Sequence, residues 1–437
     1  MAEEGAVRVR TSEESPVVRR LEVEVDAARV RQAFERAYRD LARRARVRGF
    51  RPGKAPRAVL ERMYGPQIRE EIEHALVSES LPEAVKEAGL HPVGEPAIDA
   101  QPPEADAPFR YTAQIEVKPA IELPPLEGLP GQRPAADVSD TDVLTELEGL
   151  RQRNAQLLEE PAGTAAAPGH VLKLDFVGRV DGKPFQGGSG HDVAVELGSE
   201  RFLPGFAEQL EGVRAGEDRE VRVTFPEDYG NAELAGREAV FAVHVASLQR
   251  RELPELDDEF AKDLGAFEDL EALRRRVRED LRAARERAAE ARLRASLLAS
   301  LVARTSFEVP PGLIERRLDR QLARAHRELE GSMPEEALHA QLDAWREAWR
   351  PRAEREVREA LLLEAVAAKQ GLEVSDEELE AHIGALAAEQ GADAARLRSA
   401  YRQGELWEAL RVQMLDEKAL AFLCARAEVE ETEAGRD

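Results

Sequence analysis

Residues 171–182 read VLKLDFVGRVDG, and this stretch decides the character of the middle of the chain. A run rich in β-branched and apolar residues ends at Asp181-Gly182, a pair typical of a two-residue hairpin turn. Three more strand-like runs follow, namely DVAVEL (192–197), REVRVTF (219–225) and AVFAVHVASL (239–248). The turn signals between them are Gly187-Gly188, Pro204-Gly205 and Ala215-Gly216. The pattern predicts one small antiparallel β domain, which we place at 158–250.

On the N-terminal side of this domain, the sequence divides into two segments of different composition and pattern. Residues 119–168 are rich in Pro and Ala around a helix-like stretch at 140–158, which predicts a connecting arm at 119–157. Residues 1–118 predict a mixed α/β domain. Its expected elements are a strand at 17–25, a helix at 27–45 capped by Asp26, a Gly/Pro loop at 49–56, helices at 57–63 and 67–88, and strands at 93–100 and 108–117.

Downstream, residues 251–437 are almost entirely helical in pattern. The stretch from Ala266 to Val309 has no Gly or Pro, so one helix of roughly 60–65 Å is possible before Pro310-Pro311 stops it. Pro351 is expected to kink or end the helix that carries Trp345 and Trp349. Ser375 and Glu378 form a predicted capping box, and helical pattern covers 393–426 with a break at Gly404. The fold class is therefore a multidomain α+β protein with an all-α C-terminal domain.

Composition excludes several classes of protein. The chain has 437 residues and a net charge of −24, so binding to nucleic acid requires a local basic patch. The single Cys424 excludes an intrachain disulfide and a cysteine-cluster metal site. The eight histidines lack ligand spacing along the chain, so we expect no metal site: His74, His91, His170, His191, His244, His326, His339 and His382.

Several motifs that the sequence lacks indicate the cellular compartment and the need for a cofactor. No run of ~18 apolar residues is present, and the amino terminus MAEEGAVRVR is acidic without an apolar run after it. We therefore expect a cytoplasmic protein without a secretory signal. No P-loop or dinucleotide fingerprint is present either, so we expect no cofactor and a mechanism independent of ATP.

One segment inverts the charge of the chain. Residues 41–57, LARRARVRGFRPGKAPR, hold seven basic residues and no acid. Gly49 and Gly53 permit a sharply turned loop, Pro52 and Pro56 restrict it, and Phe50 stands at its tip. A basic loop that presents one aromatic ring suits a surface of RNA phosphate and protein. The alternative is a solvated helix end with Phe50 folded back into its own core.

A second segment concentrates aromatic residues. Seven of them fall within 176–241, among them Phe225 and Phe241. They are able to form an apolar pocket, but the residues alone favour their filling the core of a small β domain, and we expect Phe225 and part of Phe241 to do so.

These motifs resemble a known family. GFRPGKAP with Tyr64-Gly65, followed in order by DFVGRVDGKPFQGG, FLPGF, TFPEDY and RELPELDDEF, resembles trigger factor, the bacterial chaperone at the polypeptide exit tunnel. The resemblance covers nearly the whole chain. It implies that the loop docks on the large ribosomal subunit, on ribosomal protein and rRNA near the exit. The implied docking residues are Gly49, Phe50, Arg51, Gly53, Lys54 and Pro56. The position after Arg51 is often Lys in relatives and is Pro52 here.

The aromatic segment resembles the FK506-binding-protein type of prolyl isomerase. This resemblance implies a pocket for proline made of Phe176, Phe185, Phe202, Leu203, Phe206, Tyr229 and Phe241. Phe206 stands where a Trp is common, as in other trigger factors, and Gln186 stands where an Asp is common.

The resemblance also implies what the whole chain does. It implies an ATP-independent chaperone that holds nascent and unfolded polypeptides in a helical cradle with two arms, isomerises X-Pro bonds and supports protein export and cell division. A rival hypothesis is a secreted or periplasmic isomerase chaperone, against which the basic loop and the missing signal argue. The sequence leaves open which side chains line the cradle and whether free copies form a homodimer.

Overall fold

The computed structural model describes residues 7–47, 50, 56–198, 203–227, 229, 231, 234–265, 267–403 and 406–432, apart from the side chain of Gln186. These residues form two compact units. One combines the chain up to Pro134 with the chain from Glu290 onward, and the other holds Ala135–Ala289.

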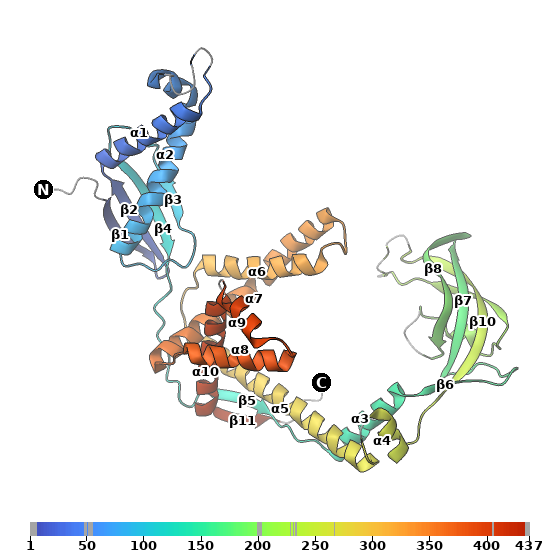
Figure 1. Cartoon of the computed structure of the whole chain (residues 1–437). Coiled ribbons are helices and arrows are strands. Elements are labelled where there is room, and N and C mark those ends of the chain that lie inside the picture. The colour runs from blue at the N-terminus through green and yellow to red at the C-terminus, as the bar shows by residue number, and fades with distance from the viewer. Residues whose placement is uncertain are drawn as a thin grey trace. The chain divides into compact units, whose positions relative to one another are not determined.

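The first unit opens with a four-stranded antiparallel sheet and two helices. In chain order these elements are β1 (Val7–Ser15), β2 (Val18–Val25), α1 (Ala27–Arg44), α2 (Arg57–Glu87), β3 (Ala97–Ala100) and β4 (Phe109–Glu116), and the sheet order is β1-β2-β4-β3. Figure 1 shows α1 and α2 lying against the sheet. Val23, Phe109 and Ile115 on the strands are buried in the core that the sheet shares with these helices. Asp26 caps α1 as predicted, because its side chain accepts a hydrogen bond from the backbone N–H of Ala28 at 2.7 Å.

Two predictions for this region were wrong. The helices expected at 57–63 and 67–88 are the single helix α2, which continues through Pro66. A proline inside a helix costs about 3 kcal/mol, but the buried stripe of Leu60, Ile68, Ile72 and Leu76 runs along both halves of α2 and holds it together. Strand β1 was not predicted, because apolar alternation is confined to Val7 and Val9 at its start.

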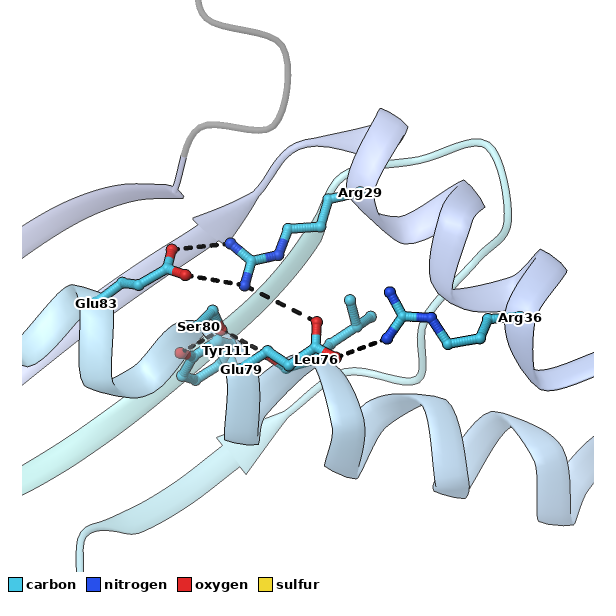
Figure 2. A network of polar contacts seen from close by, with 7 residues as sticks. All are labelled: Arg29, Arg36, Leu76, Glu79, Ser80, Glu83 and Tyr111. Carbon is cyan, nitrogen blue, oxygen red and sulfur yellow. Dashed lines mark hydrogen bonds and ion pairs between the residues drawn. The ribbon is translucent and has the colours of Figure 1, made fainter.

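Ion pairs join α1 to α2 along their length. Arg29 donates to both carboxylate oxygens of Glu83 at 2.8 and 3.2 Å, and Arg36 donates to Glu79 at 2.9 Å (Figure 2). The hydrogen bond from Arg29 lowers the pKa of Glu83. The pairs run in opposite order on the two helices, which fixes their antiparallel register.

The rest of this unit is a helical body. It contains the later part of α5 (Leu270–Ala303), with α6 (Pro311–Leu329), α7 (Glu335–Gln370), α8 (Asp376–Gln390), α9 (Ala394–Arg402) and α10 (Leu406–Arg426). Its largest core joins α5, α7 and α10 through Leu297, Leu362 and Leu423, each fully buried. Strand β11 (Glu428–Thr432), which was not predicted, pairs in parallel with β5 (Pro130–Pro134).

The helix ends differ from the predictions in two places. Helix α5 ends at Ala303, before Pro310, because Thr305 bonds the carbonyl of Leu301 and Phe307 packs into the neighbouring cores. Helix α7 does not end at Pro351, since Ala353 and Val357 continue its buried face. The capping box of Ser375 and Glu378 on α8 is confirmed.

The second unit contains the β domain. Its elements are β6 (Gln156–Glu159), β7 (His170–Val180), β8 (Lys183–Glu196), a 3₁₀ turn (Glu208–Leu210), β9 (Asp218–Thr224) and β10 (Glu238–Glu252). The sheet order is β6-β10-β7-β8, and β9 also pairs with β10. The hairpin at Asp181-Gly182 is confirmed, with φ values of 50° and 77°. The turn expected at Gly187-Gly188 is wrong, because both residues lie inside β8, beside a bulge in its pairing with β7.

Beside the β domain, three helices form a small core of their own. Helix α3 (Asp140–Arg153), α4 (Asp258–Leu264) and the first part of α5 bury Leu147, Phe260 and Leu273 together. The helix predicted within 140–158 is therefore confirmed, although its last residues form β6 instead.

Candidate functional site

The aromatic residues of the β domain form one connected cluster. Phe241 on β10 is its centre, with ring centroids 5.4 Å from Phe206, 5.8 Å from Phe176 and 6.2 Å from Phe185. The three pairs are edge-to-face, an arrangement that the ring quadrupoles favour. The fold therefore brings together residues from β7, β8, β10 and the segment before the 3₁₀ turn, all of which the resemblance implies for a pocket.

Burial divides this cluster into a floor and a rim. Phe206, Phe225 and Phe241 are buried, with at most 5% of their surface exposed. Phe176, Phe185 and Leu203 are half-buried and pack against that floor. Tyr229 is 41% exposed, and its ring lies 4.7 Å from that of Phe225. The expectation that Phe225 fills the core is confirmed, and the half-exposed rings leave apolar surface for a ligand.

Two glycines on β8 let the rim rings lie flat against the strand. A Cβ atom at Gly188 would stand 2.7 Å from Cζ of Phe185, and one at Gly190 would stand 2.8 Å from Cε1 of Phe176. Carbon atoms normally meet at about 3.5–4.0 Å. Sequence reasoning missed both glycines as pocket residues, because the requirement arises from rings on the folded sheet and leaves no motif of its own.

Phe202, which was predicted for this pocket, lies outside the described residues.

The basic loop connects the C-terminal end of α1 to the N-terminal end of α2. Phe50, 41% exposed, bonds through its backbone N–H to the carbonyl of Val47 at 3.1 Å, while Val47 is buried. Pro56 stands at the N-cap of α2. Of the predicted docking residues, Gly49, Arg51, Gly53 and Lys54 lie outside the described residues. The exposure of Phe50 argues against the alternative that its ring is folded into the core.

The base of this loop is held by charged and aromatic side chains. The guanidinium of Arg57, the first residue of α2, lies 4.9 Å from the ring centroid of Tyr38 on α1. Arg44 at the end of α1 donates to Glu71 of α2 at 2.5 Å. Burial raises the pKa of Tyr38, so its ring stays neutral beneath the cation.

Family models match the chain in three successive segments. The model described as bacterial trigger factor protein matches residues 7–150, and that of its C-terminus matches residues 269–425. Between them, the model of FKBP-type peptidyl-prolyl cis-trans isomerase matches residues 163–246.

Relatives agree over almost the full length. The trigger factor of Geobacter sp. (strain M21) is 36% identical over 418 residues, which cover 95% of this chain and 96% of the relative. That of Anaeromyxobacter sp. (strain Fw109-5) is 38% identical over 428 residues, covering 97% and 100%. The chain belongs to the trigger factor family. A solved structure described as "Promiscuous Substrate Recognition in Folding and Assembly Activities of the Trigger Factor Chaperone" supports the fold, with a TM-score of 0.54 and 22% identity over 96% of this chain and 99% of that one.

Family membership settles the coarse activity. The protein is a trigger factor chaperone with an FKBP-type domain and is a peptidyl-prolyl cis-trans isomerase. The family also implies interaction with the ribosome and with nascent chains. Among the helices that the structure describes, none combines the length and apolar character needed to cross a bilayer.

Proposed function

We propose that this trigger factor isomerises X-Pro bonds at the floor and rim of its aromatic cluster. The observation that carries this proposal is the contrast between buried Phe206 and Phe241 and half-exposed Phe176, Phe185 and Leu203 around them. A rigid floor with apolar walls suits the ring of a proline, which is compact and has no N–H to satisfy.

Isomerisation of an X-Pro bond depends on the shape and the polarity of the pocket more than on reactive side chains. Rotation about a peptide bond costs about 18–20 kcal/mol because amide resonance is lost in the twisted state. The twisted amide carries less charge separation than the planar one. An apolar wall therefore stabilises the twisted state relative to the ground state, and only such a difference accelerates the reaction. Phe185 and Tyr229 supply this wall, and the chain needs no cofactor for the step.

We further propose that the loop between α1 and α2 docks the protein on the large ribosomal subunit beside the exit tunnel. Phe50 supplies an apolar anchor, and the basic residues of 41–57 supply phosphate contacts. The pairs Arg57–Tyr38 and Arg44–Glu71 keep the two ends of the loop together. Docking of this kind places the protein in the cytoplasm and in contact with nascent chains.

Holding of unfolded chains is proposed for residues 251–437, which include the helical body, together with the linker 119–157. Leu406 and Val412 on α10 are 53% and 56% exposed, and the half-buried rings of Trp345 and Trp349 stack at 5.0 Å. By contrast, Leu361, Leu362 and Leu363 on α7 are buried in the body itself. Shallow patches bind a client weakly one by one and more tightly together, which supports a role in keeping chains open for folding or export without ATP.

Ribosome co-sedimentation tests the docking proposal. The double variant Phe50→Ala/Arg51→Ala should lose sedimentation with washed ribosomes, and wild-type binding should weaken as salt rises because phosphate contacts release counterions. The matched control Ile98→Ala/Arg10→Ala removes one exposed apolar side chain and one arginine from the sheet of the same domain and should bind normally. Equal binding of both variants at every salt concentration would refute docking through this loop.

A further inference from the structure

The β domain has a second face that the isomerase cluster does not use. Side chains alternate between the two faces of a strand. Phe176 on β7 points into the aromatic cluster, so its neighbours Asp175 and Val177 lie on the opposite, outer face. On β10, Phe241 belongs to the cluster, and Ala242 and His244 line the outer face.

Strand register brings four titratable residues into one row on that face. His244 pairs across the strands with Asp175 of β7 on one side and with Asp218 of β9 on the other. On β8, Gly190 pairs with Phe176 and Val193 with Leu174, so His191 and Asp192 lie together opposite Asp175 at a bulge. The row, from β8 to β9, is His191, Asp175, His244, Asp218.

The groups at the bulge are close enough to share an ion. Nδ1 of His191 lies 2.9 Å from Oδ1 of Asp175 and 4.0 Å from Oδ2 of Asp192. One donor atom from each of the three residues lies within 4.8 Å of the other two. The backbone N–H of Asp192 donates to Asp175 at 2.9 Å, which fixes the bulge and the spacing of the two carboxylates.

Two of the three side chains, Asp175 and His191, border an open hollow. It has a volume of about 670 Å³, and Asp175 and His191 form part of its lining, with Asp218 and His244 lining it as well. His191 and Asp192 are 82% and 69% exposed, so both can adjust their rotamers at small cost. His244 is engaged separately, with Nδ1 2.7 Å from Oδ1 of Asp218.

We propose that Asp175, His191 and Asp192 bind a divalent transition-metal ion, for which Zn²⁺ is the probe. An imidazole nitrogen with two carboxylate oxygens suits Zn²⁺, Ni²⁺ or Cu²⁺, whereas Mg²⁺ and Ca²⁺ prefer oxygen alone. The two carboxylates balance the charge of the ion. Zn²⁺ lies about 2.0–2.2 Å from such ligands, so the three groups move together slightly, and water completes the coordination.

This site escaped the sequence analysis for a physical reason. Asp175 stands sixteen residues before His191, a spacing that matches no metal motif along the chain. Only the pairing of β7 with β8, and the bulge within it, brings the side chains together. The expectation of no metal site therefore rested on chain spacing alone.

Titration of the full-length protein with Zn²⁺ by calorimetry tests the proposal, with Co²⁺ absorption as a second readout of the ligands. A background of about 5 mM Mg²⁺ occupies sites made of oxygen alone. We expect one Zn²⁺ per chain at this site and a raised melting temperature.

Variants distinguish this site from other histidines. His191→Ala and Asp192→Asn should each weaken binding at least tenfold, and circular dichroism verifies that both variants are folded. His244→Ala on the same face and His91→Ala in the first unit should change it less than threefold. The proposal is overturned if wild type binds no Zn²⁺, or if His191→Ala binds as wild type does. It is also overturned if binding is instead lost in His326→Ala, whose ring lies 6.2 Å from that of His339.

Discussion

Adding a single methyl group at Gly188 should impair the isomerase while leaving the chaperone intact. In the Gly188→Ala variant the new Cβ would stand 2.7–2.9 Å from three ring atoms of Phe185. Contact distances of about 3.5 Å require the ring to move by roughly 0.8 Å. Because Phe185 is half-buried and forms part of the rim, its ring can swing outward, so we expect the domain to fold with a stability loss of about 1–3 kcal/mol from overpacking.

The moved ring no longer faces the bound proline in the orientation that favours the twisted amide. Misplacement of a catalytic wall by about 1 Å costs up to a hundredfold in rate. We expect kcat/KM for an X-Pro peptide to fall roughly tenfold, equivalent to about 1.4 kcal/mol of transition-state stabilisation. The assay is protease-coupled isomerisation by the full-length protein, below the melting temperature of the variant.

The matched control is Ser189→Ala, one residue further along β8 and on the outer face. It should leave kcat/KM unchanged, and both variants should suppress aggregation of an unfolded client as wild type does. A folded Gly188→Ala variant with wild-type kcat/KM would refute the assignment of Phe185 to the pocket wall.

Two further predictions concern the first unit. Burial, together with the neighbouring charges of Glu364 and Glu417, raises the pKa of Asp416 from its ordinary value near 3.8 to about 6. As the pH rises through this range, the carboxyl group ionises more readily in the unfolded chain than in the folded one, so the free energy of unfolding falls. Asp416→Asn should therefore stabilise the helical body by about 1 kcal/mol at pH 7.5, a value discounted for partial exposure, and should have no effect near pH 4. Denaturant unfolding, followed by the fluorescence of the three tryptophans, which all lie in this body, measures the change in stability. A gain in stability that persists at pH 4 would contradict the prediction. Ser80 is fully buried, and its hydroxyl lies 2.8 Å from that of Tyr111 (Figure 2). Ser80→Ala should lower the free energy of unfolding by about 1–3 kcal/mol because the tyrosine hydroxyl is left buried without this partner, whereas the exposed control Ser12→Ala should leave it unchanged. In thermal unfolding, the double variant Ser80→Ala/Tyr111→Phe should recover part of the lost stability. Strictly additive effects of the two substitutions would contradict the prediction.

Local patterns sufficed to predict much of this fold. Three local predictions are confirmed: the helix caps at Asp26 and Ser375 and the turn at Asp181-Gly182. Each depends on backbone groups close by in the chain, so the neighbouring residues in the sequence are enough to predict it. The helix ends that were wrongly predicted have the opposite property. Helix α2 continues through Pro66 and helix α7 does not end at Pro351, because buried apolar residues lie on both sides of each proline; a kink at Pro351 stays a prediction. Propensity alone cannot show that packing outweighs a lost hydrogen bond.

The same division applies to the candidate site. The aromatic residues were visible as a cluster in sequence, and the resemblance assigned most of them to a pocket. Which rings form the floor and which the rim depends on burial, as the contrast between Phe206 and Phe176 shows. Gly188 and Gly190 became pocket residues only once the rings lay on β8. A glycine that is required because a ring from another strand packs against it leaves no recognisable pattern in the sequence.

The two faces of the β domain are separable because strand geometry separates them. Phe176 and Asp175 are adjacent in sequence, so their side chains leave β7 on opposite faces: Phe176 packs into the aromatic cluster, and Asp175 lies opposite His244 on the outer face. Substitutions at His191 and Asp192 therefore change the outer face without removing any aromatic ring. An ion that joins β7 to β8 at the bulge would nonetheless restrain the two strands that carry Phe176 and Phe185. The metal titration therefore reports on the outer face and the isomerase assay on the aromatic face, and the isomerase assay repeated with Zn²⁺ measures whether the restraint on β7 and β8 reaches the aromatic rings.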